Sequence, residues 1–250
     1  MAEQPSALDT AFAALAKFDW GNDAKVLQPI DAAVVACHGN AGQRTDLENR
    51  FTQLLSQPIS RAAVEYICRK LCLIGTAACV PTLAPLLGQP EHSHMARYAL
   101  ERIAAPAAGD ALRKALGTVP DELKIGMIAS LAARRDGQSV PAIAEVLAAA
   151  SKAGQTRLAV AAADALGQIQ TAAAVDALTA ATPTDAAVAA AVVNARLAAA
   201  EGLLAAKQPA KARAIYQSLV SAAAGQPRAK SIELAATRGL LACAEQTAAS

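Results

Sequence analysis

Apolar residues recur along the middle of the chain in a pattern that repeats about every thirty residues. Four segments align without gaps, and in each a leucine is followed at the third, ninth and twelfth positions by further members of the pattern. The segments are KLCLIGTAACVPTL (70–83), ALERIAAPAAGDAL (99–112), SLAARRDGQSVPAI (130–143) and ALGQIQTAAAVDAL (165–178). Their pattern positions are Leu71, Ile74, Val80, Leu83; Leu100, Ile103, Gly109, Leu112; Leu131, Arg134, Val140, Ile143; and Leu166, Ile169, Val175, Leu178.

The spacing of this pattern predicts two amphipathic helices in each repeat. We call the first leucine of each segment the anchor; successive anchors are 29, 31 and 35 residues apart. The anchor and the residue three positions later end one helix, a short polar or glycine turn follows, and the last two positions face inward from the next helix. Pro81 and Pro141 fall in the first turn of that next helix, where a missing amide proton costs little. Such hairpins bury their apolar faces by stacking on their neighbours.

Composition supports an all-α protein. The 250 residues are 54% hydrophobic but only 3% aromatic, and alanine, the best helix former, makes up about a quarter of them. The formal net charge is +2, with 23 basic and 21 acidic residues spread along the chain. A nucleic-acid-binding protein usually carries a basic stripe or domain, so we expect no nucleic-acid partner. The chain has no run of like charge that would form an interaction tail.

The repeat pattern resembles HEAT repeats, particularly the short bacterial type also found in phycobilin lyases. LAKFDWG, LIGTAACVPTLAPLL and SHMARYALERI are similar to a group of bacterial HEAT proteins without assigned function, whose members are often exported or fused to other domains. The resemblance implies a right-handed α-solenoid of HEAT-like helical hairpins. It also implies that the second helix of each hairpin lines the concave side of the array.

The two ends of the chain differ from its middle, and we expect one continuous solenoid with three parts: capping helices at 1–57, HEAT-like repeats at 58–182 and further helices at 183–250. Residues 5–17 and 24–38 predict two helices joined by FDWGND, in which Asp19 or Asn22 caps the second helix and Trp20 closes the first core layer. Near the other end, AEGLLAAKQPAKARAIYQSL partly resembles a tetratricopeptide helix pair, with Ala212 and Tyr216 at its small and aromatic positions. A final helix is predicted at 228–246.

Several sequence features bear on the compartment. The first twenty residues lack a basic start followed by a continuous apolar run, which favours the cytoplasm, whereas a leader already removed would make the protein exported. We expect no membrane span, because the most apolar window, AAVAAAVV (186–193), is short and soon meets Asn194 and Arg196. The five cysteines are an odd number in a long chain, which is not typical of a small disulfide scaffold, so we expect buried free thiols.

The stretch EHSHMARYALERI (91–103) raises the question of a metal site, because an acid and two histidines stand within four residues. Deoxyhypusine hydroxylase, a HEAT-like enzyme, binds two irons through histidine-glutamate pairs in several repeats. Here His94 is followed by Met95, and the equivalent positions of the other repeats carry no histidine. A zinc site would need four convergent ligands, and the candidates are Cys68, Cys72, Cys79, His92 and His94. Their spacing favours core cysteines and solvated histidines, so we predict no catalytic, metal or cofactor residues and no cofactor.

A surface gives a stronger indication of function. If the anchor faces the core, the residues two and five positions before it face outward on the second helix. In neighbouring repeats these positions hold the predicted binding patch of Tyr66, Arg69, Met95 and Tyr98, with His94 at its edge. Tyrosine and arginine are favoured in protein interfaces. The alternative is that the tyrosines pack between repeats.

The sequence therefore predicts a non-enzymatic scaffold that binds a protein or peptide on the concave face of a solenoid. Two other functions stay open at this point. One is a metal- or chromophore-handling enzyme of the HEAT lyase or hydroxylase type. The other is a structural subdomain of a larger exported protein, of which the chain would be a part.

Overall fold

The computed structural model describes residues 4–223 and 229–248, and every regular element in these ranges is a helix. The all-α prediction is therefore confirmed. The contacts divide the chain into two compact units, residues 1–130 and residues 131–250. The predicted division at residues 57 and 182 is a different one and stays a prediction.

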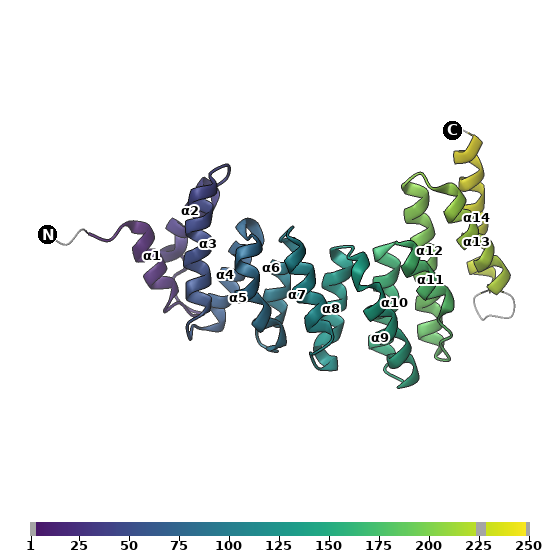
Figure 1. Cartoon of the computed structure of the whole chain (residues 1–250), viewed down its shortest axis with the longest axis horizontal. Helices are drawn as coiled ribbons and strands as arrows, with labels where there is room; N and C mark the ends of the chain where they lie inside the picture. Colours follow the sequence, from purple (N-terminus) through teal and green to yellow (C-terminus); the bar gives the residue numbers. More distant parts are fainter. Residues whose placement is uncertain (1–3, 224–228, 249–250) are drawn as a thin grey trace. The chain divides into compact units, whose positions relative to one another are not determined.

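Unit 1 consists of short helices that succeed one another along the chain (Figure 1). Side-chain caps set several of the starts: Ser6, Asn40 and Ser60 each accept a hydrogen bond from a backbone N–H of the first turn that follows. The last helix, α8, runs past the boundary between the units. The elements are α1 (Ala7–Leu15), the 3-10 helix η1 (Ala24–Leu27), α2 (Gln28–Ala36), α3 (Ala41–Leu55), α4 (Arg61–Ile74), η2 (Ala77–Cys79), α5 (Val80–Leu83), η3 (Ala84–Gly88), α6 (Ser93–Arg102), α7 (Pro106–Leu116) and α8 (Asp121–Ala133).

Unit 2 has longer helices, and its caps follow the same rules. Asp185 accepts hydrogen bonds from the backbone N–H groups of Ala187 and Val188 at the start of α12, and Thr171 caps α11. The elements are η4 (Gly137–Ser139), α9 (Val140–Lys152), α10 (Thr156–Ile169), α11 (Ala172–Ala180), α12 (Ala186–Ala205), α13 (Pro209–Ala223) and α14 (Ala229–Ala248).

The repeat pattern read from the sequence matches the helix ends and the buried residues. Helices α4 and α10 end at the residue three positions after their anchors, and α6 ends one residue earlier. The four anchor leucines are fully buried, and so are Leu83, Leu112, Ile143 and Leu178 at the twelfth position. Pro81 and Pro141 stand in the first turns of α5 and α9, as predicted. Arg134 and Val175 are only half-buried, so these two positions contribute less to the core.

The N-terminal helices confirm the predicted pair but not the role of its tryptophan. Trp20 lies in the turn between the helices with 62% of its surface exposed, and the guanidinium of Arg61 stacks over its ring at 5.6 Å. The expectation that Trp20 closes the first core layer is therefore wrong; Phe12 and Phe51 pack there instead, with their ring centroids 5.3 Å apart. The predicted caps are wrong too, because Asp23 caps the 3-10 turn that precedes α2.

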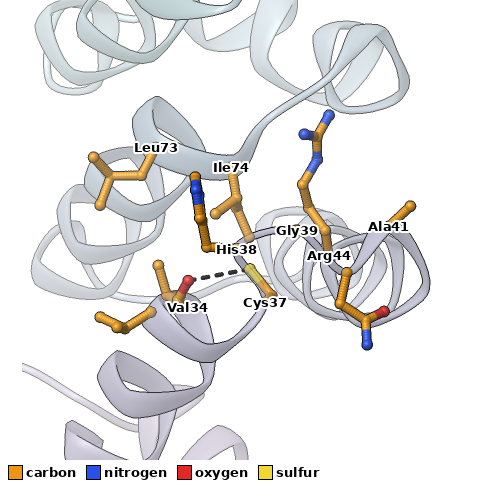
Figure 2. A pocket seen from close by; sticks show the side chains of 10 residues that line it. Val34, Cys37, His38, Gly39, Ala41, Arg44, Leu73 and Ile74 are labelled. Atoms are coloured by element: carbon orange, nitrogen blue, oxygen red, sulfur yellow. Dashed lines mark hydrogen bonds between the residues drawn. The ribbon is translucent and has the colours of Figure 1, made fainter.

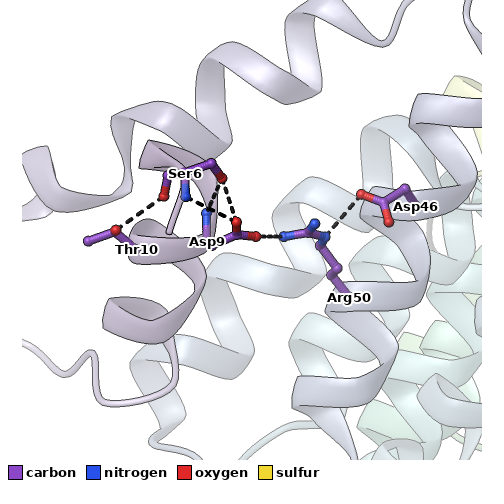
Figure 3. Close-up of polar contacts among 5 residues, drawn as sticks. All are labelled: Ser6, Asp9, Thr10, Asp46 and Arg50. Carbon is purple, nitrogen blue, oxygen red and sulfur yellow. Dashed lines mark hydrogen bonds and ion pairs between the residues drawn. The ribbon is translucent and has the colours of Figure 1, made fainter. Parts of the chain in front are cut away.

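A polar network joins α1 to α3 beside these rings (Figure 3). Asp9 accepts hydrogen bonds from Ser6 in the capping box of α1, and it pairs with Arg50 of α3 at 2.6 Å. Arg50 also pairs with Asp46 at 3.0 Å and lies over the ring of Phe12. The hydrogen bonds from Ser6 and Arg50 lower the pKa of Asp9 to about 2.

This network predicts a pH dependence of stability. Because the pKa of Asp9 is lower in the folded than in the unfolded chain, the stabilisation is complete above the ordinary value of 3.8 and is lost as the pH falls toward 2. Asp9→Asn removes the charge, so near neutral pH the free energy of unfolding is expected to be larger for the wild type than for the variant. This difference should narrow as the pH falls from 3.8 toward 2. Urea unfolding followed by circular dichroism measures the gap. The exposed Glu122→Gln serves as the control, and a gap that widens in acid would contradict the assignment.

One buried carboxylate links successive hairpins in unit 1. Glu48 of α3 is only 2% exposed. It accepts hydrogen bonds from the backbone N–H of Thr76, at 2.7 Å, and from the hydroxyl of the same residue. Thr76 caps η2, so the carboxylate satisfies the start of the next helical segment. A buried charge is tolerated only with such partners.

Helix α12 is the one helix in the described part of the chain that is long and apolar enough to cross a membrane by length and composition. The expectation that no stretch is long and apolar enough rested on the shorter window 186–193, which soon meets Asn194 and Arg196. Within unit 2, α12 packs against α10 and α13, and Ala191, Ala195 and Ala199 are buried. Arg196 is also buried on this helix and donates a hydrogen bond to Ser218 of α13 at 2.7 Å. These contacts bury part of the apolar surface of α12 inside unit 2.

The C-terminal helices bury the two residues that carry the tetratricopeptide resemblance. Ala212 and Tyr216 lie on the inner face of α13, where α13 packs along α14. Their cluster includes Leu219 of α13 and Ala236 of α14. The predicted final helix is α14.

Candidate binding surface

The predicted patch lies on α4 and α6, which pack side by side in unit 1. Tyr66 and Arg69 come from α4, and His94, Met95 and Tyr98 come from α6. The structure therefore brings the five residues onto two neighbouring second helices. It does not expose them equally: Arg69, His94 and Tyr98 are exposed, and Tyr66 and Met95 are half-buried.

Tyr66 is held by contacts within the protein. Its hydroxyl donates a hydrogen bond to Asp31 of α2 at 2.7 Å, and Lys70 lies over its ring while pairing with the same carboxylate at 2.6 Å. Burial and Asp31 raise the pKa of Tyr66. Burial also raises the pKa of Asp31, but the hydrogen bonds from Lys70 and Tyr66 outweigh it and leave that pKa below its usual value. Tyr66 thus joins α2 to α4.

Two exposed apolar residues were not recognised in the sequence. Leu73 of α4 is 71% exposed and stands one turn after Arg69, and Val35 of α2 is 76% exposed. Leu73 could have been found by following the outward face from Arg69 to the next turn, since residues four apart share a helix face. Together with Tyr98 of α6, Val35 and Leu73 give each of the three second helices α2, α4 and α6 an exposed apolar side chain.

The charged groups of this surface are mostly paired. Arg69 forms an ion pair with Glu65 one turn earlier on α4. On α6 the ring of His94 is hydrogen-bonded to the guanidinium of Arg97 at 3.3 Å. Arg97 also donates to the backbone carbonyl of Gly126 and to the hydroxyl of Ser130, both on α8. A Cβ at position 126 would stand 2.5 Å from this guanidinium, so any larger residue there would make the side chain of Arg97 shift.

The cysteines and histidines considered for a metal site are dispersed. Cys68 and Cys79 are buried, Cys72 is half-buried, and all five cysteines of the chain are free thiols. Burial, together with Glu65, raises the pKa of Cys68 to about 12, and burial and Glu48 raise that of Cys79 to about 12. Such thiols are protonated at neutral pH, and the thiolate is the form that binds metals and attacks carbon. Residues 4–223 and 229–248 contain no group of three or more potential ligands placed to hold a metal ion.

Comparison with known proteins identifies one of the repeats. Residues 158–182, which span most of α10 and all of α11, match the family model of the PBS lyase HEAT-like repeat. This segment is a HEAT-like repeat. A search of the curated proteins found no match to the chain. The HEAT-like segment contains the fourth aligned segment of the sequence. The other three segments share its fully buried residues at the anchor and at the twelfth position, and their helices end two or three residues after the anchor. The predicted family resemblance is confirmed.

Proposed function

We propose that the chain is a non-enzymatic scaffold that binds a protein or peptide on the solvent-exposed face of α2, α4 and α6, the second helices that line the concave side of a HEAT-like array. The observation that supports this is the row of exposed apolar side chains, Val35, Leu73 and Tyr98, on three successive second helices of unit 1. Exposed apolar surface costs free energy in water, about 25 cal/mol for each Å², and a partner recovers that cost on binding. HEAT-like repeats provide a long face of this kind.

The chemistry of the reactive side chains also favours a scaffold. The buried thiols of Cys68 and Cys79 are held in the protonated form by their raised pKa values, so they are poor nucleophiles and poor metal ligands. The guanidinium of Arg97 on α6 donates hydrogen bonds to Gly126 and Ser130 of α8, so it joins these two helices. These groups stabilise the array.

The contacts of Tyr66 decide which residues test the surface. Replacing Tyr66 would remove the hydrogen bond to Asp31 and change stability as well as the surface. Arg69 and Tyr98 are exposed, so the double variant Arg69→Ala with Tyr98→Ala is expected to keep the melting temperature within a few degrees of the wild type. We expect it to weaken partner binding about tenfold or more, because tyrosine and arginine dominate interface energies.

A photo-crosslinking amino acid at position 98 provides the direct test. In cells that express the protein, it is expected to give a defined adduct that the Arg69→Ala substitution reduces. The same amino acid at Leu241, an exposed position on α14 of unit 2, is the control and should give none of that adduct. Equal labelling from both positions, or no adduct from position 98, would overturn the proposed surface. A large fall in the melting temperature of the double variant would show that its residues belong to the core.

A further inference from the structure

A hollow lies at the end of the proposed surface, where the C-terminal ends of α2 and α4 meet the start of α3. Its volume is 660 Å³, within the range of about 300–1,000 Å³ found for ligand pockets. We call it the α2–α4 hollow; Val35, His38, Asn40, Arg44, Leu73 and Ile74 are among its lining residues. Figure 2 shows Leu73, Ile74 and His38 on one side of it and Arg44 on the other.

The local sequence explains why the hollow exists. Helix α2 ends at Ala36, and the buried thiol of Cys37 donates a hydrogen bond to the carbonyl of Val34, which fixes the last turn. Gly39 takes a positive φ of 80°, a conformation that side chains disfavour, and turns the chain toward α3. The side chain of Asn40 then caps α3. Leu73, next to the last residue of α4, lies beside this reversal and is exposed.

The walls of the hollow are apolar and its rim is basic. Val35 and Leu73 are the two most exposed large apolar side chains in the described part of the chain, and both face this hollow. Arg44 and His38 are exposed at its rim, and none of its lining residues is acidic. Within the described residues the guanidinium of Arg44 pairs with no carboxylate, whereas the nearby Asp46 is paired with Arg50 and Asp31 with Lys70.

We infer that the α2–α4 hollow binds an acidic, leucine-containing segment of a partner protein. The aliphatic side chain packs against Val35, Leu73 and Ile74, and an aspartate or glutamate beside it in the segment pairs with Arg44. Charge complementarity selects this partner, because an apolar wall next to an unpaired cation matches an apolar residue next to a carboxylate. The inference rests on the proposed scaffold function and adds the chemistry of the partner.

Fluorescence polarisation with synthetic peptides tests the inference. The probe is a fluorescein-labelled, amidated peptide, Gly-Asp-Leu-Leu-Asp-Gly, with two matched peptides in which asparagine replaces aspartate or alanine replaces leucine. The aspartate peptide is expected to bind the full chain saturably, and the alanine peptide about tenfold more weakly or worse. The asparagine peptide should bind about threefold more weakly, the size of an exposed ion pair.

Variants of the protein assign this binding to the hollow. Arg44→Gln should lower the affinity for the aspartate peptide to that of the asparagine peptide and leave the latter unchanged. Leu73→Ser should weaken binding of both, while Leu241→Ser, at an exposed leucine of unit 2, serves as the matched control. Because Leu73 is exposed, its replacement should not unfold the protein, and the melting temperature verifies this.

The results separate this inference from the proposed function. Equal affinity for the aspartate and asparagine peptides would overturn the acidic partner, and binding unaffected by Leu73→Ser would overturn the site. A specific crosslink from position 98 without binding of any peptide would retain the scaffold and reject the acidic leucine segment. Absence of both would reject the two together.

Discussion

Replacing Leu100 by alanine is expected to lower the free energy of unfolding by about 2–5 kcal/mol, and Leu166→Ala should do the same in unit 2. Both leucines are fully buried at the end of a second helix, where they contact the helices packed around them. Truncation to alanine removes the transfer free energy of the side chain and leaves a cavity that rigid helices fill only in part. Because each hairpin is stabilised by its neighbours, the loss extends beyond the substituted repeat.

Urea unfolding followed by circular dichroism measures this loss. Leu73→Ala and Leu241→Ala are matched controls in units 1 and 2, since both leucines lie mostly in solvent. They are expected to change the free energy of unfolding by no more than about 0.5 kcal/mol. A loss below that value in both Leu100→Ala and Leu166→Ala would contradict the repeat register.

Gly167→Val is expected to destabilise unit 2 by about 1–3 kcal/mol, the usual cost of overpacking. Helices α10 and α12 pack closely, and a Cβ at position 167 would stand 2.8 Å from both Cα and Cβ of Ala195. The obstruction includes backbone, so no side-chain rotation relieves it and the two helices must separate. The loss should exceed any gain from the better helix propensity of valine over glycine.

Thermal unfolding of Gly167→Val is compared with that of Gln168→Val, which adds the same side chain at the next, exposed position of α10. The control should unfold close to the wild-type temperature. A Gly167→Val protein as stable as the control would mean that the helices are not held at this distance.

The contact between Gly167 and Ala195 also shows how an alanine-rich chain with few aromatic residues forms a dense core. Small side chains at the contact allow the two helices to approach closely.

Much of the array follows from the sequence because its signal is local and repeated. The anchor leucines, the helix ends three residues later and the prolines in the first turns all reflect backbone and hydrophobic periodicity within a single hairpin. A residue such as Leu166 is buried in any stacking of such hairpins. These features do not depend on which helix packs against which.

Which side chains meet between different helices depends on the tertiary structure. Tyr66 occupies an outward position of α4, but Asp31, thirty-five residues earlier, accepts its hydrogen bond and removes it from the free surface. Trp20 was expected in the core, but its turn projects into solvent, where Arg61 covers the ring. Leu73 continues the outward face of α4 one turn after Arg69, and in the structure it stays 71% exposed beside the turn between α2 and α3.

The sequence by itself thus determined the all-α class, the HEAT-like hairpins and most of their buried positions, since these depend on the periodic placement of apolar residues along the chain. Only the tertiary structure decided which outward positions remain exposed, because exposure depends on the side chains that neighbouring helices contribute. The paired Tyr66 and the unpaired Arg44 differ for this reason: Asp31 reaches the first, and the part of the chain that the structure describes brings no carboxylate to the second.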